Sequence, residues 1–146
     1  MRQTFVEFLH NLPFYGLAVV CIDDPGVQAI LPALHRATLT YGFSAEADVR
    51  AENLVREGLR SRFTVVRPAP APPLQVVLNL PGRHNVLNAL AAVAVACDLE
   101  LDDAACQQAL ASFEGVDRRL QMLGDIVIGG HSVTLVDDYG SLIRAR

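Results

Sequence analysis

Apolar residues near the start of the chain recur first with the spacing of a helix and then with that of a buried strand. A helix is predicted over residues 2–12, because large apolar side chains follow the i, i+3, i+4, i+7 pattern at Phe5, Phe8, Leu9 and Leu12. The continuous apolar run at 17–22 is typical of a parallel strand covered on both faces. Asp24 and Pro25 then supply an N-cap and a first helical residue, and Pro32 should end that second helix.

A second strand is expected at 37–43, so helix and strand alternate as they do in βαβ units. Beyond residue 47 the pattern changes to short strands, expected at 48–55, 61–66 and 74–78. A β-hairpin is expected later, its two strands and its Gly-Gly turn lying at 120–128, 132–136 and 129–130. We therefore predict an α/β fold: a partial doubly wound parallel sheet with flanking helices, plus a small antiparallel β-sheet beside it.

Two further helices are expected between these strands. The first opens near His84 and runs to about Asp98. Asp102 and Asp103 begin the second and Gly115 closes it. The buried stripe of this second helix is expected at Cys106, Ala109, Leu110 and Phe113.

The composition of the chain argues against several classes of function. The net charge of -4 and the lack of a basic run argue against a nucleic-acid partner, and no apolar stretch reaches the roughly 18 residues that favour a membrane span. Three widely spaced cysteines, Cys21, Cys97 and Cys106, predict free buried thiols in a reducing, cytoplasmic compartment and no metal site. All 12 basic residues are arginine, so the lysine that a P-loop requires is absent from this chain.

The stretch at 80–92 carries the most informative chemistry. A Gly-bearing turn after the strand expected at 74–78 places His84 and Asn85 at the entrance of a helix, with Asn88 one turn on and on the same face as Asn85. Two carboxamides offer donors and acceptors that suit the edge of a purine base. The simpler interpretation makes Asn85 the N-cap and leaves His84 and Asn88 solvated, and spacing alone favours it.

Two other polar segments have a functional and a simpler interpretation. Arg118 and Arg119 follow the second of these helices, and they are either a solvated surface pair or a bidentate phosphate clamp. Asp138 and Tyr139 follow the last predicted strand. Carboxylates there are often only a polar turn, but the carboxyl ends of strands are also where open α/β sheets bind ligands.

Longer motifs favour the functional interpretation of these polar segments over the simpler one. The stretch at 80–92 resembles the nucleotide-binding helix of the Mur ligase family, which has a glycine, a His-Asn pair and a second Asn before an Ala-rich helix. Other motifs are similar to the branch of that family that joins L-alanine to UDP-N-acetylmuramate, and they occur in matching order at 4–16, 23–25, 41–43, 115–119 and 137–140. The resemblance extends from the first residues to Gly140.

The resemblance implies an ATP-dependent, cytoplasmic ligase of peptidoglycan precursor synthesis, and thus a role in cell wall biogenesis, cell shape and cell division. ATP would phosphorylate the UDP-N-acetylmuramate carboxylate, and L-alanine would attack the acyl phosphate. Arg119 would face a phosphate, with Asp138 near the ribose and Tyr139 packed beside the nucleotide. The complete set of nucleotide-binding residues implied here is His84, Asn85, Asn88, Asp138 and Tyr139.

The same resemblance implies that residues 1–140 are the second half of the central ATP-binding domain. The P-loop and the ligands of Mg²⁺ are then expected outside this chain, so the isolated chain should be inactive. Residues 141–146 replace the His-His-Pro of the family pattern and are expected to be a non-native tail. The alternatives are a standalone nucleotide-binding module and a non-catalytic interaction domain.

Overall fold

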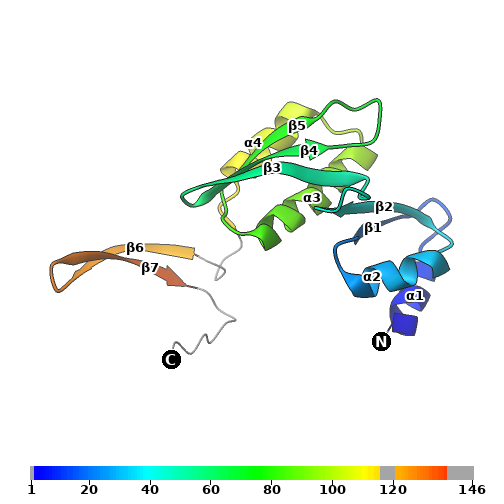
Figure 1. Cartoon of the computed structure of the whole chain (residues 1–146), viewed down its shortest axis with the longest axis horizontal. Helices are drawn as coiled ribbons and strands as arrows, with labels where there is room; N and C mark the ends of the chain where they lie inside the picture. The colour runs from blue at the N-terminus through cyan, green and yellow to red at the C-terminus, as the bar shows by residue number, and fades with distance from the viewer. Residues whose placement is uncertain (1, 116–120, 138–146) are drawn as a thin grey trace. The chain divides into compact units, whose positions relative to one another are not determined.

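Helices and strands follow one another along the chain largely as the apolar pattern predicts (Figure 1). The computed structural model describes residues 2–115 and 121–137, and it forms two units that divide between Phe113 and Glu114. The elements of the first unit are, in order, α1 (Arg2–His10), β1 (Leu17–Cys21), α2 (Pro25–Ile30), the 3-10 turn η1 (Leu31–Ala33), β2 (Ala37–Gly42), β3 (Val49–Glu57), β4 (Arg60–Val66), β5 (Leu74–Leu78), α3 (Arg83–Asp98) and α4 (Asp103–Ser112).

The start and the end of α2 follow from three residues. Asp24 is the N-cap, because its Oδ1 accepts hydrogen bonds from the backbone N–H groups of Gly26 (2.6 Å) and Val27 (3.0 Å). Pro25 takes the first helical position, where a missing N–H costs nothing. The helix gives way to η1 at Leu31, just before Pro32, so the predicted helix end is confirmed.

The five strands of the first unit form one sheet in the order β1-β2-β3-β4-β5. The pairs β1–β2 and β2–β3 are parallel, whereas β3–β4 and β4–β5 are antiparallel. The predicted fold class is therefore confirmed, with one correction: the antiparallel strands continue the parallel sheet and do not form a sheet of their own. Asp48 makes this junction, since its Oδ2 accepts hydrogen bonds from the N–H (2.9 Å) and the hydroxyl (2.6 Å) of Thr40 and so aligns β3 with β2.

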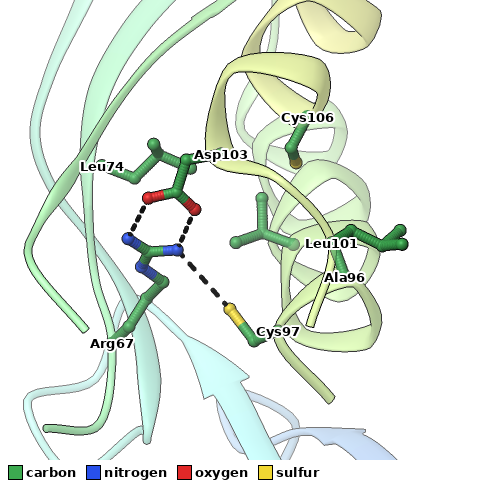
Figure 2. A pocket seen from close by; sticks show the side chains of 8 residues that line it. Arg67, Leu74, Ala96, Cys97, Leu101, Asp103 and Cys106 are labelled. Atoms are coloured by element: carbon green, nitrogen blue, oxygen red, sulfur yellow. Dashed lines mark hydrogen bonds and ion pairs between the residues drawn. The ribbon is translucent and has the colours of Figure 1, made fainter. Parts of the chain in front are cut away.

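A buried ion pair attaches α4 to the sheet (Figure 2). Arg67 follows β4, and its side chain is only 6% exposed. Its guanidinium donates to both carboxylate oxygens of Asp103 at 2.5 and 2.8 Å and to the carbonyl of Pro72 at 2.6 Å. The hydrogen bond from Arg67 holds the pKa of Asp103 below its ordinary value. Arg67 therefore joins the end of β4, the proline-rich loop and the first turn of α4.

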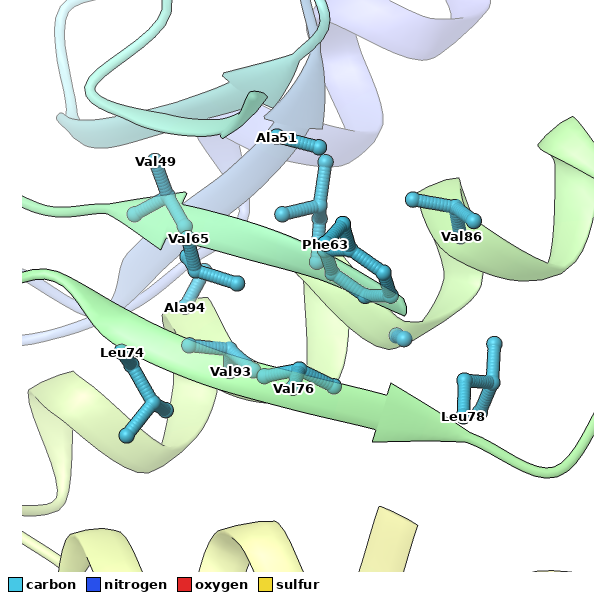
Figure 3. Packing of buried hydrophobic residues seen from close by; sticks show 12 residues of the cluster. Val49, Ala51, Phe63, Val65, Leu74, Val76, Leu78, Val86, Val93 and Ala94 are labelled. Atoms are coloured by element: carbon cyan, nitrogen blue, oxygen red, sulfur yellow. The ribbon is translucent and has the colours of Figure 1, made fainter. Parts of the chain in front are cut away.

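The core lies between the sheet and α3, which contacts β1, β2 and β3 (Figure 3). Alternate residues of β4 and β5 point towards this helix, as expected for strands with one covered face. Phe63, Leu78, Leu90 and Val93 are among the most deeply buried side chains. The full cluster of buried residues is Val49, Ala51, Phe63, Val65, Leu74, Val76, Leu78, Val86, Ala89, Leu90, Val93 and Ala94.

Two predicted apolar stripes are less buried than their periodicity indicated. On α1, Phe5 and Phe8 are 59% and 68% exposed, and after α4 Phe113 is 44% exposed. Ala109 of α4 is exposed as well, while Cys106 and Leu110 are half-buried. The reason is that α1 packs against α2, and α4 against β5 and α3, so each helix has too few neighbours to cover its whole stripe.

The second unit contains a β-hairpin of β6 (Gln121–Ile128) and β7 (His131–Asp137). Gly129 and Gly130 connect the strands with positive φ angles of 59° and 83°, which favour glycine in a two-residue turn. The predicted hairpin is thus confirmed. Among the helices in the described ranges, none is long and apolar enough to cross a bilayer.

Candidate functional site

The carboxyl ends of the parallel strands β1 and β2 are joined by one carboxylate. Asp23 follows β1, and its two oxygens accept hydrogen bonds from the backbone N–H of Phe43 at 3.0 and 2.9 Å and from that of Ser44 at 3.0 Å. Gly42 ends β2, and a Cβ at that position would overlap Asp23 Oδ1. Asp23 therefore occupies space that only a glycine at residue 42 leaves free.

Helix α3 begins beside this edge of the sheet. The guanidinium carbon of Arg83, the first helical residue, lies 3.5 Å from the centre of the Phe43 ring, and Nη2 of Arg83 lies 3.9 Å from Asp23 Oδ2. The first contact is a cation–π interaction. The second is too long for a good hydrogen bond and acts by charge attraction. Open α/β sheets bind ligands outside the carboxyl ends of their strands, so α3 opens where a ligand is expected.

The simpler interpretation of Asn85, that it is the N-cap of this helix, is wrong. Gly82 is the N-cap of α3, with φ 101° and ψ 141°, and no side chain caps the helix. Asn85 is the third residue of the helix, and its carboxamide nitrogen donates to the carbonyl of Pro81 at 2.7 Å. This bond ties the first turn of the helix back to the loop that precedes it.

The three nucleotide residues predicted in the described part of the chain all lie in the first two turns of α3. His84 and Asn88 are exposed, whereas Asn85 is half-buried. His84 and Asn88 are four residues apart and Asn85 and Asn88 three apart, so Asn88 neighbours both of the other residues on the helix surface. Exposed polar groups at this position are free to contact a ligand.

Sequence reasoning missed three residues of this constellation. Asp23, Phe43 and Arg83 lie in the motifs at 23–25, 41–43 and 80–92, but the sequence predicts no site role for any of them. Residues separated by 20 and by 40 positions meet here because β1 and β2 pair in parallel and α3 packs against both strands. Such a contact leaves no periodic signal in the sequence.

The remaining predicted site residues, Arg119, Asp138 and Tyr139, lie outside the described residues, as does Arg118. Their assignments stay predictions. All three cysteines, Cys21, Cys97 and Cys106, are free, as predicted, but they are half-buried rather than fully buried. In residues 2–115 and 121–137, no group of three or more His, Cys, Asp or Glu side chains is placed to hold a metal ion.

A small cavity beside the Arg67–Asp103 pair does not compete as a ligand site. Apolar side chains and the two half-buried thiols of Cys97 and Cys106 line it, together with the ion pair itself. The guanidinium of Arg67 reaches towards the sulfur of Cys97 at 3.9 Å (Figure 2). Burial raises the pKa of the Cys106 thiol, which keeps that thiol protonated. The cavity belongs to the attachment of α4.

Fold and site together define an open α/β domain with a polar helix entrance at the carboxyl edge of its parallel strands. The sequence profile of the Mur ligase middle domain matches residues 1–96, well over half of the chain. The chain belongs to this family.

Solved Mur ligases share the fold. UDP-N-acetylmuramate-alanine ligase MurC of Thermotoga maritima matches 94% of this chain, with a TM-score of 0.74 and 26% sequence identity, over 29% of its own length. MurF of Acinetobacter baumannii matches 88% of this chain, with a TM-score of 0.72 and 25% identity, over 27% of its own. MurF of Thermotoga maritima in complex with ADP has a TM-score of 0.68 and 21% identity, covering 92% of this chain and 29% of that one. The chain therefore spans less than a third of the length of these ligases.

Proposed function

We propose that this chain forms the adenine and ribose side of the ATP site of a Mur ligase. The observation that carries the proposal is the position of Asn85 and Asn88, which open α3 beside the carboxyl edge of two parallel strands. Membership of the Mur ligase family supports it. In the complete enzyme, this site would bind the ATP that drives the formation of an amide bond in peptidoglycan precursor synthesis.

The bond between Asn85 and Pro81 determines what Asn85 offers to a base. A backbone carbonyl only accepts hydrogen bonds, so the carboxamide nitrogen of Asn85 must face Pro81 and its oxygen must point the other way. An acceptor in that place suits the exocyclic amino group of adenine and disfavours guanine, which has a carbonyl there. The exposed carboxamide of Asn88 can supply both a donor and an acceptor.

The other contacts of the nucleotide are proposed for residues outside the described ranges. Arg119 would neutralise charge on a phosphate, because a guanidinium is planar and always charged. Asp138 would bind the ribose hydroxyls, and Tyr139 would pack beside the nucleotide. The P-loop lysine and the Mg²⁺ ligands would come from other parts of the enzyme, since this chain has no lysine.

L-alanine and UDP-N-acetylmuramate are proposed as the other substrates on the strength of the sequence motifs. MurC and MurF resemble the chain to a similar degree, so the structural similarity alone supports a Mur ligase without choosing its amino acid. The motifs at 4–16 and 23–25 are the longest of those that favour L-alanine.

The test is a titration of the isotope-labelled chain with ATP and with GTP, followed by NMR. ATP should shift the amide signals of Arg83 to Asn88 and bind more tightly than GTP. Asn88→Ala should raise the dissociation constant for ATP by about tenfold, the equivalent of one lost hydrogen bond of about 1.4 kcal/mol.

Asn11→Ala is the matched control, because Asn11 is an exposed carboxamide that follows α1 and lies outside α3. It should leave ATP binding unchanged. A chain that is folded but shows no shift in α3 with ATP, or an Asn88→Ala variant that binds ATP like the wild type, would contradict the proposal.

A further inference from the structure

We propose that Asp23 is a positioning residue of the nucleotide site, which acts through Phe43 and Arg83 to hold the first turn of α3 against the sheet. The inference rests on the proposed function, because it concerns how the adenine-reading carboxamides are placed. According to this inference, the contacts among Asp23, Phe43 and Arg83 contribute to the selectivity of the site for adenine.

Asp23 is built into the sheet edge rather than solvated. Its side chain is 22% exposed, and its two oxygens accept three hydrogen bonds from the backbone after β2. Hydrogen bonds from backbone N–H groups to an ionised carboxylate are stronger than those between neutral groups. The loop at Phe43 and Ser44 is therefore fixed to the end of β1.

The fixed loop places the Phe43 ring where the guanidinium of Arg83 packs against it. The Phe43 ring lies under the guanidinium at 3.5 Å, a distance at which the planar cation and the ring face stack. The Arg83 side chain is 65% exposed, so solvent screens its attraction to Asp23, and the ring contact carries more of the attachment. Asp23 thus acts on α3 mainly through the place that it gives to Phe43.

Displacement of this turn would displace the base-reading groups. His84 and Asn85 follow Arg83 directly, and Asn88 lies one turn on. A shift of about 1 Å in a positioning element is enough to cost up to a hundredfold in function. Discrimination between adenine and guanine depends on the direction in which the carboxamides of Asn85 and Asn88 point. Loss of the Asp23 contacts should therefore weaken this discrimination more than it weakens the affinity for either nucleotide.

The experiment measures the ratio of the dissociation constants for GTP and ATP in four variants of the whole chain. Asp23→Asn keeps the size of the side chain but sets an amide NH₂ against backbone donors, and Phe43→Leu removes the ring. Both should move the ratio towards one. Phe43→Tyr keeps the ring face and should retain the wild-type ratio.

Asp102→Asn is the matched control. Asp102 also accepts a backbone hydrogen bond, from Ala105 at 3.0 Å, but it caps α4 and touches no part of the site. A lower folded fraction reduces binding of both nucleotides equally and leaves the ratio unchanged. An Asp23→Asn or Phe43→Leu variant with the wild-type ratio would overturn the inference.

A second measurement separates this inference from the proposed function. The amides of Asn85 and Val86 both bond to the Gly82 carbonyl, at 3.1 and 3.3 Å, so their hydrogen exchange reports on the first turn of α3 without nucleotide. In Asp23→Asn and Phe43→Leu, exchange should accelerate about tenfold at these amides relative to those at the middle of α3. Unchanged exchange overturns the positioning role, whereas a wild-type chain that binds no nucleotide overturns only the proposed function.

Discussion

Arg67 shows how this fold buries a charged side chain. Its guanidinium is almost fully covered, yet its donors face the Asp103 carboxylate and the Pro72 carbonyl. The carboxylate is 42% exposed, so water solvates part of the pair. Burial without such partners would cost several kcal/mol. The pair is therefore a structural connection between β4 and α4.

Asp103→Asn should lower the free energy of unfolding by about 1–2 kcal/mol at neutral pH, because it leaves a buried cation with a weaker partner in a partly solvated site. The folded pKa of Asp103 lies below its ordinary value. Its stabilisation is therefore complete above an unfolded pKa of about 4 and is lost as the pH falls through the folded pKa. Urea denaturation at several pH values should show wild type and variant converging in acid.

Glu57→Gln provides the comparison for this prediction. Glu57 pairs with Arg62 at 3.0 Å, but both side chains are about half exposed, at 47% and 53%. Exposed pairs contribute little, so this variant should unfold like the wild type at every pH. Equal losses of unfolding free energy in the two variants would show that the burial of Arg67 does not increase the contribution of Asp103 to stability.

At the scale of elements, the start of α3 depends on the backbone of Gly82. Its φ of 101° and ψ of 141° lie in a region that residues with a Cβ rarely occupy. A Cβ there would also lie 2.8 Å from Cε1 of His84. The residue that turns the chain into the helix therefore cannot carry a side chain without strain.

Gly82→Ala should cost about 2–3 kcal/mol of unfolding free energy and shift the His84 resonances, because both the backbone and the imidazole must move. Gly58→Ala provides the comparison, because Gly58 has a positive φ in the milder left-handed region and open space at its Cβ position. Gly58 has a φ of 63°, and a Cβ there would meet nothing within 4 Å, so about 1 kcal/mol is expected. Equal costs, measured by chemical denaturation, would show that neither the backbone region of Gly82 nor the contact with His84 adds to the cost of a positive φ.

The elements themselves were largely predictable. Apolar periodicity and local caps located α2, α3 and the β6–β7 hairpin to within a few residues, because these depend on neighbours in sequence. The burial of α1 and α4 was not predictable in the same way. Periodicity identifies an apolar stripe, but only the packed neighbours decide how much of that stripe is covered.

At the scale of the whole molecule, the chain should not act as a ligase by itself. Phosphoryl transfer requires a cradle of backbone amides, a lysine and Mg²⁺ around the terminal phosphates. The chain contains no lysine, and it spans 29% of the length of the MurC that it matches. The lysine that such a reaction needs is therefore missing from these 146 residues.

Purified chain mixed with ATP, Mg²⁺, UDP-N-acetylmuramate and L-alanine should release no phosphate above the buffer control. The Asn88→Ala variant provides a check for contamination, because a host ligase would give the same rate with either preparation. Turnover in the wild type that disappears in this variant would defeat the prediction.

The sequence by itself determined which segments are helices and strands, the parallel start of the sheet, the family and the position of the Asn85–Asn88 pair. These features follow from local spacing, capping and contiguous motifs, which a linear chain displays directly. The tertiary structure alone decided that β3 joins β2, that Gly82 and not Asn85 caps α3, and that Asp23, Phe43 and Arg83 meet. Each of these features depends on backbone direction or on contacts between residues that are distant in the sequence. Neither property can be inferred from the amino-acid sequence alone.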